Sequence, residues 1–164
     1  MRNEWLVFIL LTACTAAIVV DSMKITSPAF QHEGMIPSDY TCDGADKMPT
    51  LRVSDIPAAT KSLALIMDDP DAPMGTWDHW ILWNIPPDTK TITGPIGTAG
   101  KNSWGRTDYG GPCPPSGVHR YYFKLYALDA TLDLPAGSNK KALETAMKGH
   151  VLVHAELMGK YQRR

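Results

Sequence analysis

The sequence predicts a mainly β protein, a sandwich of sheets with one or two peripheral helices. Thirteen prolines and thirteen glycines among 164 residues are typical of a chain rich in turns. Between these turns lie several apolar or alternating runs of strand length, whereas only one stretch has helical periodicity. Strands of this kind bury their apolar faces when one sheet packs on another, so a sheet-on-sheet sandwich follows.

Two continuous apolar runs, Ser62 to Met67 and His79 to Ile85, predict strands that are buried on both faces. If they are antiparallel neighbours joined by residues 68–78, Asp69 and His79 lie at the same end of the sheet. Strict alternation places Asp69 on the same face as Leu63, Leu65 and Met67. It places His79 on the same face as Ile81 and Trp83. Both side chains then border a core.

A third strand is expected from His119 to Leu128, where the odd positions are mostly apolar. His119 should therefore point toward the core. A final strand begins at Val151 and has four apolar residues on one face: Val151, Val153, Ala155 and Leu157.

One helix is expected within residues 138–149. Ser138 is suited to cap its N-terminus and Gly149 its C-terminus. Its apolar stripe is formed by Leu143, Ala146 and Met147.

The chain divides into an N-terminal segment, residues 1–22, and a single domain, residues 23–164. Arg2 followed by a short apolar run and by Leu-Thr-Ala-Cys resembles a bacterial lipoprotein signal, in which Cys14 becomes lipidated. This interpretation places the protein at the cell envelope, with the membrane reached only through the anchor. Two alternatives stay open: a segment uncleaved or cleaved elsewhere, or a cytoplasmic protein that starts at Met23.

Charge and cysteine content limit the classes of partner. The net charge is -1 and the basic residues are scattered, so nothing favours nucleic acid binding. If Cys14 carries lipid, Cys42 and Cys113 remain as a pair for which an oxidising compartment permits a disulfide. Two separate, partly buried thiols are the alternative.

Two segments carry the polar residues of a candidate site. The first, residues 68–78, contains Asp69 and leads to His79; the second, residues 109–118, is rich in glycine and proline and leads to His119. If both loops meet at one rim, a carboxylate, two imidazoles and exposed backbone N–H groups surround a small cavity. Such groups suit a small oxyanion or a zwitterionic head group better than a polyanion.

These segments resemble the two signatures of the phosphatidylethanolamine-binding protein family, and most closely its bacterial Raf-kinase-inhibitor-like branch, the YbhB/YbcL type. The matching sequences are DPDAP at residues 69–73, then His79, and GPCPPSGVHRY at residues 111–121. The shorter motifs SPAF, YTCDG and KNSWG support the match, which runs from about Lys24 to the end of the chain. The chain departs from the pattern at ADKMPTL, where Met48 and Thr50 replace small or rigid residues.

The resemblance implies a β-sandwich with a large antiparallel sheet, a smaller sheet and an anion pocket at one end. Carried over residue by residue, it assigns eight residues to the pocket: Asp69, Asp71, Pro73, His79, Gly111, Pro115, His119 and Tyr121. For Asp71, bracing of the loop or pairing with Arg120 is the stronger reading. The other two aspartates of the first loop, Asp68 and Asp78, need no role beyond closing the hairpin.

The function favoured by these features is binding without catalysis. The expected ligand is a phosphate-type anion or phosphoethanolamine head group, and no cofactor is expected. Modulation of a kinase, a protease or another protein partner is compatible with this binding function. The oligomeric state stays open, a homodimer being one option. The alternative is a metal-dependent hydrolase that uses His79, His119 and Asp69 as metal ligands.

Overall fold

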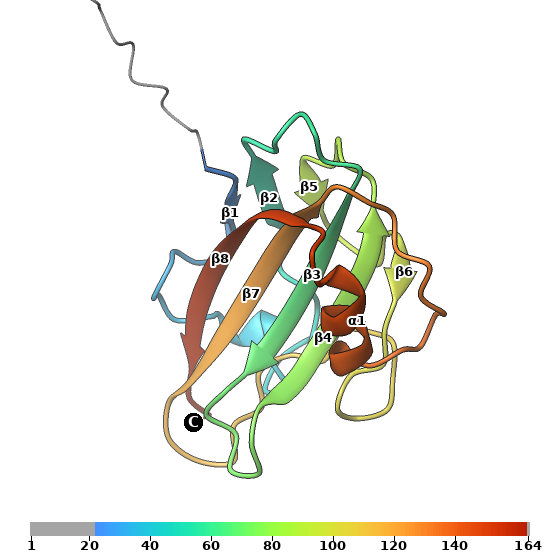
Figure 1. Cartoon of the computed structure of the whole chain (residues 1–164). Coiled ribbons are helices and arrows are strands. Elements are labelled where there is room, and N and C mark those ends of the chain that lie inside the picture. Colours follow the sequence, from blue (N-terminus) through green and yellow to red (C-terminus); the bar gives the residue numbers. More distant parts are fainter. Residues whose placement is uncertain (1–21, 164) are drawn as a thin grey trace, which may run out of the picture.

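The computed structural model describes residues 22–163 and shows two antiparallel sheets packed face to face (Figure 1). The large sheet has the strand order β6-β4-β3-β7-β8 and the small one β1-β2-β5. The eight strands are β1 (Lys24–Thr26), β2 (Leu51–Ser54), β3 (Ser62–Asp69), β4 (Trp77–Ile85), β5 (Thr91–Ile92), β6 (Thr98–Ala99), β7 (His119–Leu128) and β8 (Val151–Tyr161). A 3-10 turn, η1 (Ser38–Tyr40), and one helix, α1 (Lys140–Met147), complete the elements. The expected sandwich, with a large and a smaller sheet, is confirmed.

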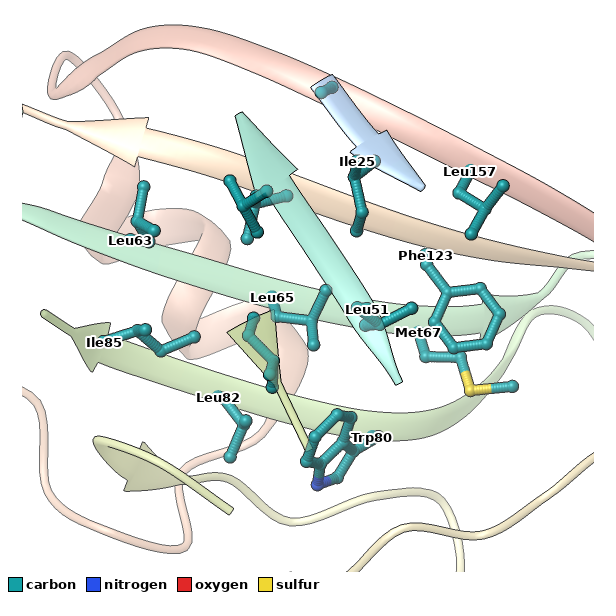
Figure 2. Packing of buried hydrophobic residues seen from close by; sticks show 14 of the residues in the cluster. Ile25, Leu51, Leu63, Leu65, Met67, Trp80, Leu82, Ile85, Phe123 and Leu157 are labelled. Atoms are coloured by element: carbon teal, nitrogen blue, oxygen red, sulfur yellow. The ribbon is translucent and has the colours of Figure 1, made fainter. Parts of the chain in front are cut away.

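The main core fills the space between the two sheets. Ile25 and Leu51 of the small sheet face the aliphatic and aromatic side chains of β3, β4 and β7 (Figure 2). A second, smaller core lies between the other face of the large sheet and α1. β3 is buried at every position because it is central in the sheet and both of its faces are covered, which is why its sequence is continuously apolar.

Helix α1 presents Leu143 and Met147 to the large sheet, as its stripe predicts. Its N-terminal cap is one residue later than expected: Asn139 accepts the Ala142 N–H at 3.0 Å, whereas the Ser138 hydroxyl bonds the Pro135 carbonyl oxygen. Both side chains can cap a helix, so the sequence pattern could not choose between them. Gly149, with φ +85°, takes the left-handed conformation expected just after the helix.

The face assigned to His79 by strict alternation is wrong. Met67 pairs with Trp80 and Asp68 pairs with Asp78, so β4 contains one extra residue, His79, at this point. Such a bulge resets the alternation of the strand. His79 therefore points to the same side as Trp80, toward the space between the sheets, while Ile81 and Trp83 face α1.

The far strand, β8, follows its expected pattern except at its beginning. Ala155 and Leu157 are buried in the main core and Val153 packs partly against it. A register shift between Ala127 and Leu128 of β7 displaces the start of β8, and Val151 is left 43% exposed.

The loops that carry the polar motifs gather at one end of the sandwich. β3 ends there, β7 begins there, and the loop between β3 and β4 closes that end (Figure 1). β1 starts at the opposite end, where Lys24 pairs with Ser54 at the last residue of β2. Among the described residues, no helix is long and apolar enough to cross a bilayer.

Candidate functional site

A cavity of about 510 Å³ opens at the end of the sandwich where these loops meet. Six of the eight residues assigned to the pocket line it: Asp69, Pro73, His79, Gly111, Pro115 and His119. They come from the end of β3, the following loop, the bulge of β4, the loop before β7 and the first residue of β7. The two segments, residues 68–78 and 109–118, therefore share one cavity.

Asp69 and His119 form a buried pair at the base of this cavity. The His119 Nδ1 lies 2.7 Å from Asp69 Oδ2, and the two side chains are 8% and 5% exposed. The other oxygen of Asp69 accepts the backbone N–H of Asp71 at 2.8 Å. Since an ionised carboxylate can only accept, the imidazole must donate through Nδ1, which fixes the orientation of the ring.

His79 is held in a different way. Its Nδ1 lies 2.7 Å from the Gly110 carbonyl oxygen, and its ring packs edge-on against Trp104 and Tyr121 at centroid distances of 5.0 and 5.2 Å. Burial lowers the pKa of His79, and this effect outweighs the hydrogen bond to Gly110 and the nearby aspartates. His79 is therefore a neutral imidazole at neutral pH.

Two glycines of the second loop, Gly110 and Gly111, do not offer their N–H groups to a ligand, contrary to expectation. The Gly111 N–H donates to Asp46 Oδ1 at 2.8 Å and the Gly110 N–H to the His79 carbonyl oxygen at 3.3 Å. Gly111 is required because a Cβ at this position would collide with Asp46 and with the carbonyl oxygen of Tyr40. The loop is thus docked closely on the segment that contains Asp46, which also lines the cavity.

Asp71 and Tyr121, the other two assigned residues, do not line the cavity. Asp71 binds Arg120 through three hydrogen bonds of 2.6 to 2.9 Å, which include the backbone N–H. It therefore ties the loop after β3 to the start of β7. Tyr121 is completely buried beneath His79, and burial together with the nearby Asp69 raises its pKa.

The Asp71–Arg120 pair predicts a loss of stability in strong acid. Hydrogen bonds and charge from Arg120 lower the Asp71 pKa from 3.8 to about 2. A carboxyl group with a lowered folded-state pKa stabilises the fold above its unfolded pKa, and this contribution disappears as the pH falls from about 4 to about 2. Denaturant unfolding across this pH range measures it. Asp71→Asn should lack this component, and an unchanged pH slope in the variant would contradict the assignment.

A disulfide joins Cys42 to Cys113, with a Cα–Cα distance of 5.4 Å. Both cysteines line the cavity, and the Cys42 N–H also donates to the Pro112 carbonyl oxygen at 3.1 Å. The bond therefore connects the segment after η1 to the glycine loop beside the site.

The sequence between Thr26 and Gln162 matches the family model described as phosphatidylethanolamine-binding protein. This match covers most of the chain. The chain belongs to the phosphatidylethanolamine-binding protein family.

Three relatives in this family match the chain over nearly their whole length. A UPF0098 protein of Methanothermobacter thermautotrophicus is 49% identical over 150 residues, which cover 86% of this chain and 99% of the relative. The crystal structure of a phosphatidylethanolamine-binding protein homologue from Chlamydia trachomatis is 41% identical with a TM-score of 0.85, covering 88% and 99% of the two chains. YbcL of Escherichia coli is 28% identical with a TM-score of 0.81, covering 87% and 99%. Archaeal and bacterial proteins are both among these relatives, so a bacterial origin stays a prediction.

The mouth of the cavity contains residues that the sequence analysis did not assign to the site. Trp77 and Trp104 meet edge-on at 5.5 Å, and Met74 beside them is 94% exposed. Arg106 lies over the Trp104 ring and pairs with Asp108 at 3.2 Å. Trp104 belongs to the KNSWG motif, and Met74 and Trp77 belong to the first candidate segment, residues 68–78. No sequence pattern indicated that these residues would meet at the mouth of the cavity.

The alternative function, a metal-dependent hydrolase, is not supported. Both oxygens of Asp69 already accept hydrogen bonds, from His119 Nδ1 and from the Asp71 N–H, so Asp69 holds His119 and the loop in place and is not free to act as a third ligand. Within residues 22–163, no group of three or more His, Cys, Asp or Glu side chains is arranged to hold a metal ion. The family relatives named above are not described as enzymes.

Proposed function

We propose that this protein binds a phosphate-type anion or phosphoethanolamine head group in the cavity, without catalysing a reaction. The observation that carries the proposal is the buried Asp69–His119 pair at the base of a cavity whose mouth is apolar. Membership of the phosphatidylethanolamine-binding protein family supports it.

The pair is suited to anion binding because the carboxylate compensates a positive imidazole. Once His119 carries a second proton on Nε2, it can donate to a phosphate oxygen while Asp69 balances its charge inside a poorly solvated site. A charge-assisted hydrogen bond of this kind is about twice as strong as a neutral one.

The mouth of the cavity favours a ligand that also has a carbon-bearing part. Met74, Trp77 and Trp104 present apolar surface next to the polar base. Amphiphilic ligands are held by such a combination of a few placed polar groups and apolar walls. Arg106, at the same mouth, adds a positive charge that attracts an approaching anion.

The cellular location of the protein is also a proposal. We place it at the cell envelope, anchored through lipidated Cys14, which lies outside the described residues. The Cys42–Cys113 disulfide supports an oxidising compartment. A protein partner, such as a kinase or a protease, is compatible with the exposed mouth of the cavity.

Removal of either member of the buried pair should abolish ligand binding. His119→Ala removes the donor and Asp69→Ala removes its counter-charge, so each is expected to weaken binding of inorganic phosphate and O-phosphoethanolamine by at least about tenfold. Titration followed by NMR measures the affinity and shows whether the variants are folded.

The matched control is His150→Ala. His150 also pairs with an aspartate, Asp129, at 2.8 Å, but the two side chains are 46% and 47% exposed and lie outside the cavity. The affinity of the His150→Ala variant for inorganic phosphate and O-phosphoethanolamine should equal that of the unmodified protein. Unchanged binding in both folded pocket variants would refute the site.

A further inference from the structure

The two histidines of the cavity use the same ring nitrogen within the protein. The Nδ1 of His79 faces the Gly110 carbonyl oxygen and the Nδ1 of His119 faces the Asp69 carboxylate, both at 2.7 Å. Because both partners are acceptors, both Nδ1 atoms must carry a hydrogen. In a neutral imidazole the other nitrogen, Nε2, is then an acceptor.

Both Nε2 atoms are directed to the cavity. Within residues 22–163 neither makes a hydrogen bond, yet neither is among the polar atoms that are sealed from solvent without a partner. His79 and His119 are 2% and 6% exposed and both line the cavity, so the cavity is the route by which each Nε2 reaches solvent. These two atoms are available to a ligand.

The surroundings give the two nitrogens opposite roles. A second proton on His119 is compensated by the Asp69 carboxylate that touches the ring. His79 instead contacts a neutral carbonyl group and the rings of Trp104 and Tyr121. The charge of a second proton on His79 is therefore not balanced by a carboxylate bonded to the ring. Burial accordingly lowers the pKa of His79. When His119 carries this second proton, the cavity offers one donor, His119 Nε2, and one acceptor, His79 Nε2.

We propose that the cavity selects phosphate groups that retain a hydroxyl, namely phosphate monoesters or protonated inorganic phosphate, over phosphodiesters. This proposal rests on the proposed function of the cavity as a phosphate-type site. A P–OH group donates to His79 Nε2 while an ionised oxygen of the same phosphate accepts from His119. A phosphodiester has no hydroxyl, so it leaves the lone pair of His79 unmatched.

The other charges around the cavity act in the same direction. Asp46 and Asp69 line it and disfavour a doubly charged phosphate, so among the forms of a monoester they favour the singly charged one that keeps its hydroxyl, whereas Arg106 at the mouth favours any anion. Tyr121 lies beneath His79, and Asp68 and Asp78 influence His79 from the ends of β3 and β4. A site built to bond a hydroxyl rejects the analogue that lacks it.

The test compares methyl phosphate with dimethyl phosphate by NMR titration of the full domain at about pH 6, where a phosphate monoester keeps a hydroxyl in about half of its molecules. The monoester is expected to bind at least about tenfold more tightly. Equal affinities would overturn the proposal while leaving the phosphate site intact. Binding of neither compound, nor of inorganic phosphate, would instead refute the proposed function.

A second pair of ligands separates the hydroxyl from an ammonium group, which could also donate to His79. O-Phosphoethanolamine is a monoester, and glycerophosphoethanolamine is a diester with the same ammonium. The monoester should again bind more tightly. Equal binding of these two would assign the donor to the ammonium and overturn the proposal.

The role of His79 is tested by His79→Phe, which should remove the preference for methyl over dimethyl phosphate. Nitrogen chemical shifts of the unmodified protein give a measurement that does not depend on the variant's folding. With methyl phosphate bound, His79 should remain protonated on Nδ1 alone. A proton found on His79 Nε2 in that complex would overturn the proposal.

Discussion

Loss of the Cys42–Cys113 disulfide is expected to lower the free energy of unfolding by about 4 kcal/mol. The bond closes a loop with a sequence separation of 71, and such a cross-link removes much of the conformational freedom of the unfolded chain. Because a domain of this size is stable by only about 5 to 15 kcal/mol, this is a large share. Denaturant unfolding of the Cys42→Ser/Cys113→Ser variant measures it.

The double-serine variant also supplies the control for chemical reduction. A reducing agent should destabilise the unmodified protein by a similar amount and leave the variant unchanged. A loss below about 1 kcal/mol would contradict the prediction, because the cross-link would then restrict the unfolded chain far less than its loop length indicates.

Asp68→Ala should destabilise the protein by about 3 kcal/mol, although Asp68 lies outside the cavity. Its carboxylate is 1% exposed and binds the amino groups of Lys124 and Lys140 at 2.8 to 2.9 Å. Hydrogen bonds to Asp68 and Asp78 raise the pKa of Lys140 in spite of its partial burial. Removal of Asp68 leaves these half-buried ammonium groups with an incomplete set of partners.

The matched control for this prediction is Asp78→Ala. Among the residues that the structure describes, the Asp78 carboxylate pairs with Lys140 alone, at 2.9 Å, and it is 21% exposed, so its loss should cost about 1 kcal/mol. Both variants should bind phosphate normally, because neither residue lines the cavity. Equal destabilisation by the two substitutions would contradict a central role for Asp68.

The fold could be predicted largely from the sequence because its long strands follow simple patterns. His119 points to the core as the alternation of β7 indicates, and the continuous apolar run of β3 reflects burial on both faces. The face of His79 could not be predicted in this way. One extra residue in β4 reverses the assignment, and a bulge has no reliable signature in a single sequence.

The candidate site was accessible to sequence analysis only through its motifs. Six assigned residues meet in the cavity because their loops occupy the same end of the sandwich. Asp46 bonds Gly111 across 65 positions of sequence, and no local pattern links such a pair. The same holds for Asp68 and its two lysines, because Lys124 comes from β7 and Lys140 from α1.

The position of β1 has a consequence for the orientation of the whole molecule. Because β1 starts at the end of the sandwich farthest from the cavity, an attachment through the residues before it would leave the opening directed away from the attachment surface. A lipid in the membrane leaflet that holds the attachment could then reach the cavity only if the domain turned over. Soluble molecules, or the surface of a facing membrane, would meet the cavity directly.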